Sequence, residues 1–398
     1  MPLEKICILG LGYIGLPTAA LLANRGYQVH GVDVVKEVVD TINSGKVHII
    51  EPELDTFVQS AVRSGNLKAN LFPEPSDIFI IAVPTPFKEG NKPDLSYVES
   101  AAKSIAPFVE EGNLVILEST SPIGTTEKVK KILEDYSVNT ESIFIAYCPE
   151  RVLPGQVMKE LIENDRIVGG INKISTEKVA AFYSRFVSGE VIKTGARTAE
   201  LCKLAENSYR DTNIAFANEL SLVCDAANIN VWEVIKLANK HPRVNILQPG
   251  TGVGGHCIAV DPWFIISEFP NETKLIRAAR EVNNYKTDWV IEKINSTALK
   301  FELEHHRKPV IGLLGLSFKP NIDDLRESPA VKVVQEIHSH HQTLVVEPHI
   351  SKHSHFTLVS LESAIESADI LVYLVGHKVF RPAVSTQKLV LDFCNING

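Results

Sequence analysis

The sequence is poor in the features that mark disulfide-stapled, metal-binding or membrane-spanning proteins. It contains only six cysteines in 398 residues, and none of them forms a CxxC pair. This spacing excludes a small disulfide scaffold and offers no cluster of metal ligands, so we predict no metal site. No apolar run approaches the roughly 20 residues that a membrane span needs. We therefore expect a cytoplasmic protein with reduced thiols and no membrane anchor.

Long runs of like charge are also missing. The chain has 40 basic and 48 acidic residues, with a formal net charge of -8. An acidic chain without a lysine- or arginine-rich stretch lacks the electrostatic footprint of a nucleic-acid-binding protein. The hydrophobic content of 44% and the charged content of 22% are typical of a globular protein. A chain of this length predicts two or three domains.

What the chain has instead is a regular alternation of short apolar runs and helical patterns over its first 150 residues. The runs KICIL, DIFII and SIFIAY are rich in isoleucine and are closely followed by glycine, alanine or cysteine with proline. Such runs predict buried parallel strands joined by crossover helices. RIVGG and EVIKT extend the same sheet to about residue 195. We predict a doubly wound domain over residues 1–196.

The pattern changes at Thr198, where a helical periodicity continues for 31 positions without glycine. A helix of this length predicts a rod that joins domains or forms a dimer interface. A second helical stretch completes a central domain over residues 197–304. Strand patterns then return in PVIGLLGL, TLVVE and DILVYLV, so residues 305–398 form a second, smaller Rossmann-like domain. The predicted fold class is α/β, with two Rossmann-like doubly wound domains joined by a long central helix.

A glycine motif follows the first predicted strand and opens the first helix. It reads Gly10-Leu-Gly12-Tyr-Ile-Gly15, and Asp33 ends the next strand 23 residues after Gly10. In this context the helix N-terminus faces a pyrophosphate and the aspartate accepts a hydrogen bond from a ribose hydroxyl. An acidic residue at that position favours NAD over NADP. The alternative is that the glycines only make a tight turn.

Polar residues also follow three later strands, in AVPTP, ESTSP and YCPE. They are Thr85, Thr120 and Glu150. Ligands of doubly wound sheets bind outside the carboxyl ends of the strands, where these side chains are expected. Each one could instead be an ordinary cap or turn former. Glu150 is the strongest candidate, because a partly buried carboxylate can orient or deprotonate a water molecule.

Two further motifs carry candidate catalytic groups. Lys203 and Asn207 lie four apart on the long helix and share one face, where they could stabilise an oxyanion or simply be solvated. In GTGVGGHCIAVDP, Cys257 follows four glycines, which allow a ligand to approach the backbone closely. A cysteine there can attack an aldehyde, with Asp261 serving the water that hydrolyses the thioester. An inert turn cysteine is the alternative.

Basic groups surround these motifs. Arg243 and His241 in KHPRVN could bind an anionic oxygen. In GLSFKPNIDDLRESPA, Lys319 and Arg326 precede a helix that begins near Ser328. Cations at a helix N-terminus suit a diphosphate, whereas the missing third glycine argues against a second dinucleotide motif. We predict that this domain binds a nucleotide of another kind.

These motifs and their order identify a resemblance that runs from about residue 5 to residue 390. The chain resembles the UDP-glucose/GDP-mannose dehydrogenase family, the nucleotide-sugar 6-dehydrogenases. The resemblance implies a four-electron oxidation of the sugar C6 alcohol to a carboxylate with NAD as cofactor, for surface polysaccharide precursor synthesis. It also implies a UDP-sugar substrate and a homodimer.

The resemblance assigns roles by position. The implied catalytic residues are Cys257 as nucleophile, Lys203, Asn207, Asp261, Glu150 and Thr120. The implied cofactor-binding residues are Gly10, Gly12, Tyr13, Ile14, Gly15, Asp33, Thr85, Thr120 and Arg326. The implied substrate-binding residues are Glu150, Arg151, Val152, Lys203, Asn207, Arg210, His241, Arg243, Gly254, Phe318 and Lys319.

The cysteine loop departs from the pattern of the UDP-glucose enzymes. Val260 stands where those members usually carry a lysine, and GGHCIAVDP replaces GGSCFPKD. The loop is more similar to that of members acting on UDP-N-acetyl-D-mannosamine. UDP-N-acetylglucosamine or another UDP-hexose remains an alternative substrate. A two-electron hydroxyacid dehydrogenase and a non-catalytic nucleotide-binding module also remain open.

Overall fold

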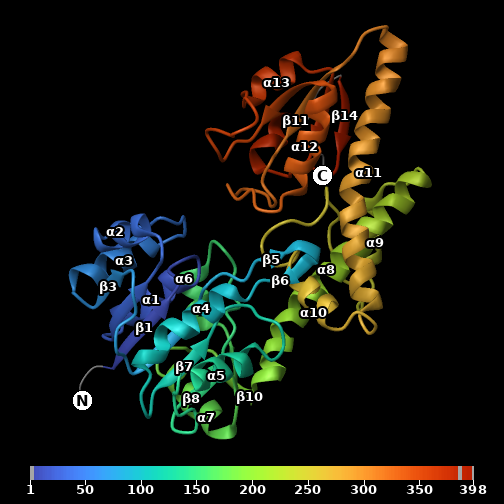
Figure 1. Ribbon diagram of the computed structural model, residues 1–398. Coiled ribbons are helices and arrows are strands. Elements are labelled where there is room, and N and C mark those ends of the chain that lie inside the picture. Colours follow the sequence, from blue (N-terminus) through green and yellow to red (C-terminus); the bar gives the residue numbers. More distant parts are fainter. Residues whose placement is uncertain (1–3, 384–387, 397–398) are drawn as a thin grey trace. The chain divides into compact units, whose positions relative to one another are not determined.

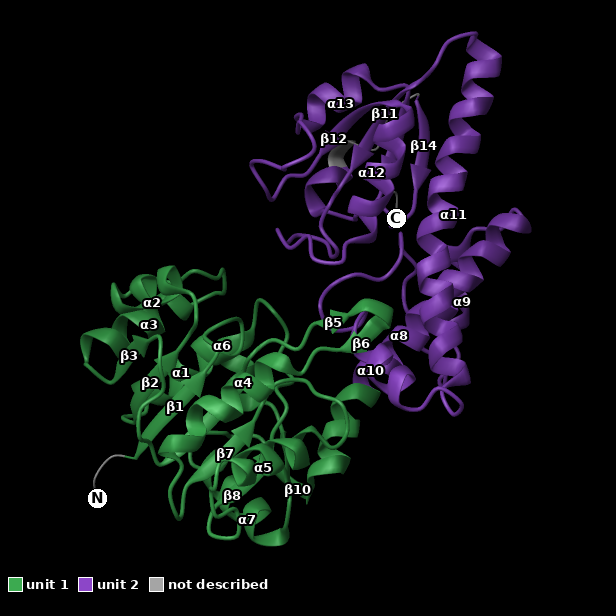
Figure 2. Cartoon of the chain, viewed as in Figure 1, with its two compact units in different colours: residues 1–205 green, residues 206–398 purple. Residues whose placement is uncertain are grey.

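The computed structural model describes residues 4–383 and 388–396 of the chain. The chain forms two compact units, residues 1–205 and residues 206–398 (Figure 2). The 31-residue helix α8 (Ala196–Ala226) contributes residues to both units. Among the described residues, no helix combines the length and apolar character that crossing a bilayer requires.

Unit 1 alternates strands and helices along the chain (Figure 1). Its strands are β1 (Lys5–Leu9), β2 (Gln28–Val32), β3 (Leu67–Asn70), β4 (Ile78–Ile81), β5 (Phe87–Lys88), β6 (Lys92–Pro93), β7 (Leu114–Leu117), β8 (Phe144–Tyr147), β9 (Arg166–Gly170) and β10 (Val191–Gly195). Its helices before α8 are α1 (Gly15–Asn24), α2 (Lys36–Asn43), α3 (Leu54–Arg63), α4 (Ser96–Ile105), α5 (Thr125–Asp135), α6 (Val157–Glu163) and α7 (Lys173–Tyr183).

Eight of these strands form one sheet in the order β10-β9-β8-β7-β4-β1-β2-β3. Strand order reverses between β1 and β4, which is where doubly wound sheets bind their ligands. Alternate residues of β1 face opposite sides of the sheet: Ile6 and Ile8 pack into one core, Cys7 and Leu9 into the other. Both faces are therefore covered, as the apolar strand runs predicted.

One pairing in this sheet is antiparallel. β9 runs against β8, with Tyr147 opposite Gly169, while every other ladder in the sheet is parallel. The sequence pattern shows that RIVGG is a strand but does not show its direction. This reversal brings the first residue of β9 to the carboxyl end of β8.

Unit 2 contains long helices and a second sheet. The helices after α8 are α9 (Val231–Ala238), α10 (Asp261–Glu268), α11 (Lys274–His305), α12 (Pro329–His340) and α13 (Leu361–Ser367). The strands β11 (Val310–Leu314), β12 (Gln342–Val346), β13 (Ile370–Tyr373) and β14 (Leu389–Asp392) pair in parallel in the order β12-β11-β13-β14. The predicted fold class, with two Rossmann-like sheets and a long central helix, is confirmed. The three predicted domain boundaries stay a prediction.

Candidate active site

The glycine loop of unit 1 has the geometry of a dinucleotide site. Gly10 adopts a φ of +90°, and a Cβ there would lie 2.7 Å from the Ala82 carbonyl oxygen. A Cβ on Gly15 would lie 1.8 Å from the Gly10 carbonyl oxygen, so this glycine lets α1 pack closely on the loop. A Cβ on Gly12 would meet nothing within 4 Å. The loop is thus tightly packed at Gly10 and Gly15 and open at Gly12, which leaves room for a pyrophosphate at the start of α1.

Asp33 lies beside this loop at the end of β2. Its Oδ2 accepts a hydrogen bond from the Leu11 amide at 3.0 Å, and its Oδ1 accepts one from the Val35 amide at 3.0 Å. Each carboxylate oxygen keeps a lone pair for a ribose hydroxyl. The loop residues Tyr13 and Ile14 are exposed and half-buried respectively. These features fit NAD, with the Asp33 carboxylate available to a ribose hydroxyl.

Two of the three strand-end candidates of unit 1 are in contact, and Glu150 has other partners. The Thr85 hydroxyl donates to the Thr120 carbonyl oxygen at 2.6 Å, which ties the ends of β4 and β7. Glu150, past β8, is only 6% exposed. Its Oε1 accepts from the Arg151 amide at 2.7 Å, and its Oε2 lies 2.5 Å from Nη1 of Arg166. Both oxygens of this candidate carboxylate are therefore engaged.

The segment that follows Glu150 is held in place by a residue that lies about 100 positions earlier in the chain. Glu51, which is buried, accepts hydrogen bonds at 2.8 Å from the Gly155 and Val157 amides. Val152 packs against the core, and the Arg151 guanidinium donates to the Asp165 carbonyl oxygen at 3.2 Å. This segment is thus a constrained loop rather than a free linker. Sequence analysis missed Glu51, because nothing in its own motif points to a loop about 100 residues away.

The start of α8 is anchored to unit 1 by a buried carboxylate. Glu200 accepts hydrogen bonds from the Gly124 amide at 2.6 Å and from the Thr126 amide and hydroxyl at 2.8 and 2.6 Å. It thereby satisfies amides at the N-terminus of α5. Lys203 follows one turn later and is half-buried. Glu200 therefore fixes the helical segment that carries Lys203.

In unit 2, Cys257 ends a glycine loop one turn before α10. Its side chain is exposed, and its carbonyl oxygen accepts hydrogen bonds from the Val260 and Asp261 amides at 3.1 and 2.9 Å. Asp261 is only 3% exposed, and its Oδ2 accepts from the Asn207 amide nitrogen at 2.5 Å. The structure thus joins Asn207 to Asp261 and places an accessible thiol four residues before this pair. Such a thiol can attack a carbonyl carbon.

The cysteine loop packs on the loop that follows β11. A Cβ on Gly254 would lie 2.9 Å from Cβ of Phe318, and a Cβ on Gly255 would lie 2.8 Å from the Phe318 ring. The Gly255 amide also donates to the Arg326 carbonyl oxygen at 3.0 Å. Two motifs that are about 60 residues apart in sequence therefore form one surface. The glycines are needed here because the aromatic ring leaves no room for side chains.

His256 does not provide a permanent charge beside Cys257. Burial and the nearby Arg326 guanidinium lower the pKa of the His256 imidazole below its usual value, so it is neutral near pH 7. The Arg326 guanidinium itself binds Asp324, with an Nη2 to Oδ2 distance of 2.6 Å. The remaining basic candidates Arg210, His241, Arg243 and Lys319 are all exposed.

A buried polar network, missed by sequence analysis, holds the cysteine loop against α8 and α11. Arg280 donates to Asp211 Oδ1 at 2.6 Å and reaches the Ile258 carbonyl oxygen at 3.5 Å. Asn283 donates to the same Asp211 oxygen at 2.8 Å and accepts from Asn218 at 2.8 Å. Burial raises the pKa of Asp211 to about 6. The sequence does hold one signal for this network, since polar residues recur at helical spacing on the faces of α8 and α11 that meet.

The second sheet lacks an open equivalent of Asp33. Glu347, at the end of β12, has a fully buried side chain and accepts from the Leu316 and Ser317 amides at 2.7 and 3.1 Å. His377 Nε2 donates to it at 3.1 Å, because the Asn321 amide donates to His377 Nδ1. This carboxylate is already occupied by hydrogen bonds from its own domain, so at that place the smaller sheet has no carboxylate available to a ribose. The finding fits the absence of a third glycine in its sequence motif.

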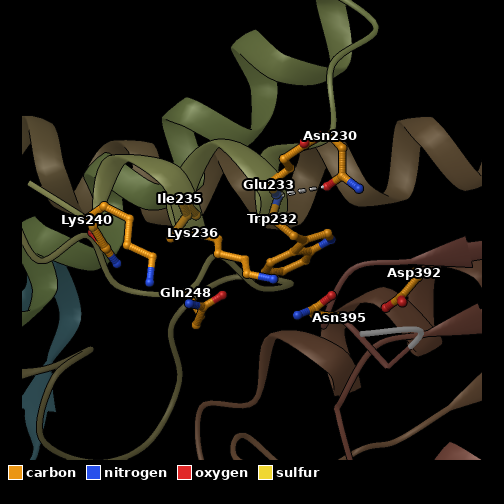
Figure 3. Close-up of a pocket in the computed structure, with 10 residues that line it drawn as sticks. Asn230, Trp232, Glu233, Ile235, Lys236, Lys240, Gln248, Asp392 and Asn395 are labelled. Atoms are coloured by element: carbon orange, nitrogen blue, oxygen red, sulfur yellow. Dashed lines mark hydrogen bonds between the residues drawn. The ribbon is translucent and has the colours of Figure 1, made fainter.

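A separate pocket of about 850 Å³ lies between α9 and the residues around the end of β14. Trp232 and Lys236 project into it from α9, on the side of Gln248 and Asn395 (Figure 3). It contains none of the predicted site residues, and its lining carries charges of both signs without a cysteine, histidine or hydroxyl side chain. Among the described residues, no group of three or more histidine, cysteine and acidic side chains is arranged to hold a metal ion.

A glycine loop that fits NAD, and an accessible thiol four residues before a fixed carboxylate, are the features of a dehydrogenase that can carry a substrate covalently. Comparison with known families gives the particular class. Three models of the UDP-glucose/GDP-mannose dehydrogenase family match the chain: the NAD binding domain over residues 4–187, the central domain over 197–285 and the UDP binding domain over 312–397. The chain belongs to this family and is an NAD-dependent nucleotide-sugar dehydrogenase.

Individual relatives agree with this class. The chain is 54% identical to a UDP-N-acetyl-D-mannosamine dehydrogenase of Campylobacter jejuni, over 98% of this chain and 99% of that protein. It is 53% identical to an NDP-N-acetyl-D-galactosaminuronic acid dehydrogenase of Ralstonia nicotianae, over 95% of this chain and 92% of that protein. The solved UDP-D-ManNAc dehydrogenase of Pyrococcus horikoshii superposes with a TM-score of 0.91 at 40% identity, covering 98% of this chain and 96% of that chain. The predicted family and cofactor are confirmed.

Proposed function

We propose that this protein oxidises the C6 hydroxymethyl group of UDP-N-acetyl-D-mannosamine to a carboxylate, giving the uronate for surface polysaccharide precursors. The observation that carries the proposal is the cysteine loop, with an accessible thiol four residues before a buried Asp261 that Asn207 holds at 2.5 Å. The substrate is supported by the C. jejuni and P. horikoshii relatives, which are named for UDP-N-acetyl-mannosamine.

The proposed reaction has two oxidations and one hydrolysis. The glycine loop and Asp33 would hold NAD, which would serve as the hydride acceptor for each oxidation. The C6 alcohol first loses a proton and a hydride and becomes an aldehyde. The Cys257 thiolate then forms a C–S bond with the aldehyde carbon, and the resulting thiohemiacetal loses the second hydride to become a thioester. Water cleaves the C–S bond, which releases the carboxylate and restores the thiolate.

The polar residues have separate tasks in this scheme. Lys203 supplies positive charge to the oxygen that becomes negative on C6, which lowers the barrier in the transition state. Asn207 orients Asp261 and keeps a second amide N–H for the substrate. Glu150 and Thr120 orient the water that hydrolyses the thioester. Glu150 suits this role because both of its oxygens are already fixed.

The nucleotide is recognised by exposed basic groups and by the loop after β11. Lys319 and Arg326 face a diphosphate, and Phe318 with Gly254 shapes the entrance to the cysteine loop. Arg151, Val152 and Arg210 contact the sugar. Arg243 and His241 contact the sugar nucleotide in the neighbouring subunit's site. These assignments rest on the positions of the motifs, and alanine substitutions should raise KM more than they lower kcat.

The proposal includes a homodimer in the cytoplasm. Tyr209, Phe216 and Val223 recur every seven residues on α8 and are 71%, 55% and 58% exposed. Large apolar side chains at this spacing form a continuous stripe on a helix, and a second copy of the chain would bury it. A reducing compartment keeps the Cys257 thiol available for catalysis.

A second candidate substrate is UDP-N-acetyl-D-galactosamine, because the R. nicotianae relative, which is named for NDP-N-acetyl-D-galactosaminuronic acid, is almost as similar. Initial rates of NADH formation with four UDP-sugars separate the candidates: the N-acetyl derivatives of mannosamine, galactosamine and glucosamine, and UDP-glucose. We expect kcat/KM to be at least about tenfold higher for the mannosamine substrate, a difference of about 1.4 kcal/mol. A higher value for any other sugar would reassign the substrate within the family.

A further inference from the structure

Because β9 runs antiparallel to β8, the guanidinium of Arg166 lies next to Glu150. The β8–β9 ladder pairs Ala146 with Gly170 and Tyr147 with Gly169, and the same register continued outward sets Glu150 opposite Arg166. The side chains meet there, with Nη1 of Arg166 2.5 Å from Oε2 of Glu150, and they are 3% and 5% exposed. A parallel β9 would have put its first residue at the opposite edge of the sheet.

A second buried carboxyl group interacts electrostatically with the same guanidinium. Glu118 follows β7 and is 3% exposed. Its Oε1 accepts a hydrogen bond from the Tyr183 hydroxyl at 2.6 Å, and the Arg166 guanidinium lies 5.4 Å from the centre of the Tyr183 ring. The cluster thus contains two buried carboxyls and one guanidinium.

The hydrogen bonding of the cluster is incomplete around the Arg166 guanidinium and both carboxyls. Four buried atoms of the cluster have no hydrogen-bond partner among the described residues: Oε2 of Glu118, Oε2 of Glu150, and Nε and Nη1 of Arg166. Arg166 and Glu150 therefore meet as a close ion pair rather than through an aligned hydrogen bond. Buried polar atoms rarely stay unsatisfied without a functional reason. A movement of Arg166 that paired it with Oε2 of Glu118 would weaken the ion pair with Glu150 and the hydrogen bond from Nη2 to the Leu161 carbonyl oxygen.

The charges in the cluster make this movement depend on Glu118. Arg166 on β9, Glu150 beyond β8, Tyr183 on α7 and the Cys148 thiol are the titratable groups that face Glu118. Burial raises the pKa of Cys148 to about 12, so the thiol is neutral. Burial also raises the pKa of Glu118 to about 7, partly offset by Arg166. Glu118 is therefore neutral below this pH and competes for the guanidinium above it.

We propose that Arg166 and Glu118 are positioning residues for Glu150, with Arg166 fixing the Glu150 carboxylate and Glu118 drawing the same guanidinium away when it ionises. This proposal rests on the proposed function, in which Glu150 orients the hydrolytic water. Thioester hydrolysis is then fastest while Glu118 is protonated, and it slows as pH rises through about 7 because Glu150 loses its partner.

Three variants test the proposal through the rate of carboxylate formation. Arg166→Met should lower kcat by about 10- to 100-fold, with KM and NADH affinity within about twofold of wild type. Arg166→Lys should recover part of this loss, because it restores the charge without the planar fork. Glu118→Gln should keep the kcat of wild type at about pH 6 and lack its decline above about pH 7. A wild-type kcat in Arg166→Met, or a Glu118→Gln profile that superimposes on wild type, would overturn the proposal.

Crystal structures of the wild-type chain at about pH 6 and about pH 8.5 provide a readout that needs no substrate. We expect the Arg166–Glu150 contact at the lower pH and an Arg166–Glu118 contact at the higher pH. An Arg166–Glu150 contact that is the same at both pH values overturns the competition, even if Arg166→Met does not fold. Failure of the proposed function looks different, since the wild-type chain would then form no carboxylate from any UDP-sugar.

Discussion

At the residue scale, the surroundings of single carboxyls separate the roles that we propose for them. Asp33 keeps lone pairs available beside the glycine loop, whereas Glu347 at the corresponding place in the second sheet is fully engaged. Asp261 is fixed by an amide and Glu150 by a guanidinium. In the proposed mechanism the same side-chain type therefore binds a ribose, holds a loop in place or takes part in catalysis according to its partners.

Glu118 should make stability depend on pH. Its pKa is about 7 in the folded chain and near 4.5 when exposed, so between these values the folded state binds a proton that the unfolded state has lost. Stability from this group is present below about pH 4.5 and is lost as pH rises to about 7, by an amount on the order of 1–3 kcal/mol. Glu118→Gln removes the dependence, so its melting temperature relative to wild type should rise between about pH 5 and about pH 8.

The control for this prediction is Glu127→Gln, whose carboxylate is 53% exposed on α5. Its melting temperature relative to wild type should stay level over the same range. If the curves of Glu118→Gln and wild type ran parallel, Glu118 would not be protonated in the folded chain.

Residues whose candidate roles follow from local motifs could be predicted from the sequence. Asp33 and Cys257 stand at fixed places after a strand and after a glycine loop, so their neighbours in the sequence identify them. Arg166 could not be found in this way, because the first residue of RIVGG appears only as a strand start. Its pairing with Glu150 depends on the antiparallel register, and Glu118 depends on contacts among three separate elements.

The glycine loop allows a sharp comparison at the scale of the element. Gly12→Val places its side chain in open space, so the fold should keep its melting temperature while the side chain blocks the pyrophosphate. We expect the Kd for NADH to rise by about 100-fold or more, about 2.7 kcal/mol. Gly15→Val is the matched variant, and it should instead destabilise the fold because its Cβ would lie 1.8 Å from the Gly10 carbonyl oxygen. Fluorescence titration and thermal melts distinguish the two, and unchanged NADH affinity in Gly12→Val would contradict this account of the loop.

The network between α8 and α11 should contribute strongly to stability. Arg280→Met leaves the buried Asp211 carboxylate without its cation and should cost about 3–5 kcal/mol in the free energy of unfolding. Arg307→Met breaks an ion pair in which the arginine is 55% exposed, and it should cost less than about 1 kcal/mol. Urea unfolding measures both, and equal costs would show that Arg280 is not a structural anchor of the cysteine loop.

The sequence largely predicted which segments form strands and helices, but it did not predict strand direction or the packing between distant segments. The apolar strand runs and the long glycine-free stretch predicted the strands and α8, because period and length follow directly from residue pattern. The direction of β9 and the packing of Phe318 on Gly255 depend on long-range contacts. No local pattern encodes them.

At the scale of the whole molecule, the exposed stripe on α8 predicts the oligomeric state. Phe216→Glu puts a charge in the middle of this stripe and should convert a dimer to a monomer at micromolar concentration, because burying an unpaired carboxylate is costly. Ile174→Glu, at a position 62% exposed on α7, is the control and should remain dimeric. Sedimentation equilibrium measures the mass of each, and a monomeric wild-type chain would contradict the proposal of a dimer.

The central claim is that one chain performs both oxidations through Cys257, and the ratio of NADH formed to UDP-N-acetyl-D-mannosamine consumed tests it most directly. The account predicts two NADH for each sugar with the wild-type chain, and Cys257→Ser should reduce carboxylate formation by on the order of 10³-fold or more. Cys202→Ser, at a half-buried cysteine of α8, is the control and should keep the ratio of two. A ratio of one with the wild-type chain, or a normal yield of carboxylate from Cys257→Ser, would contradict the covalent route.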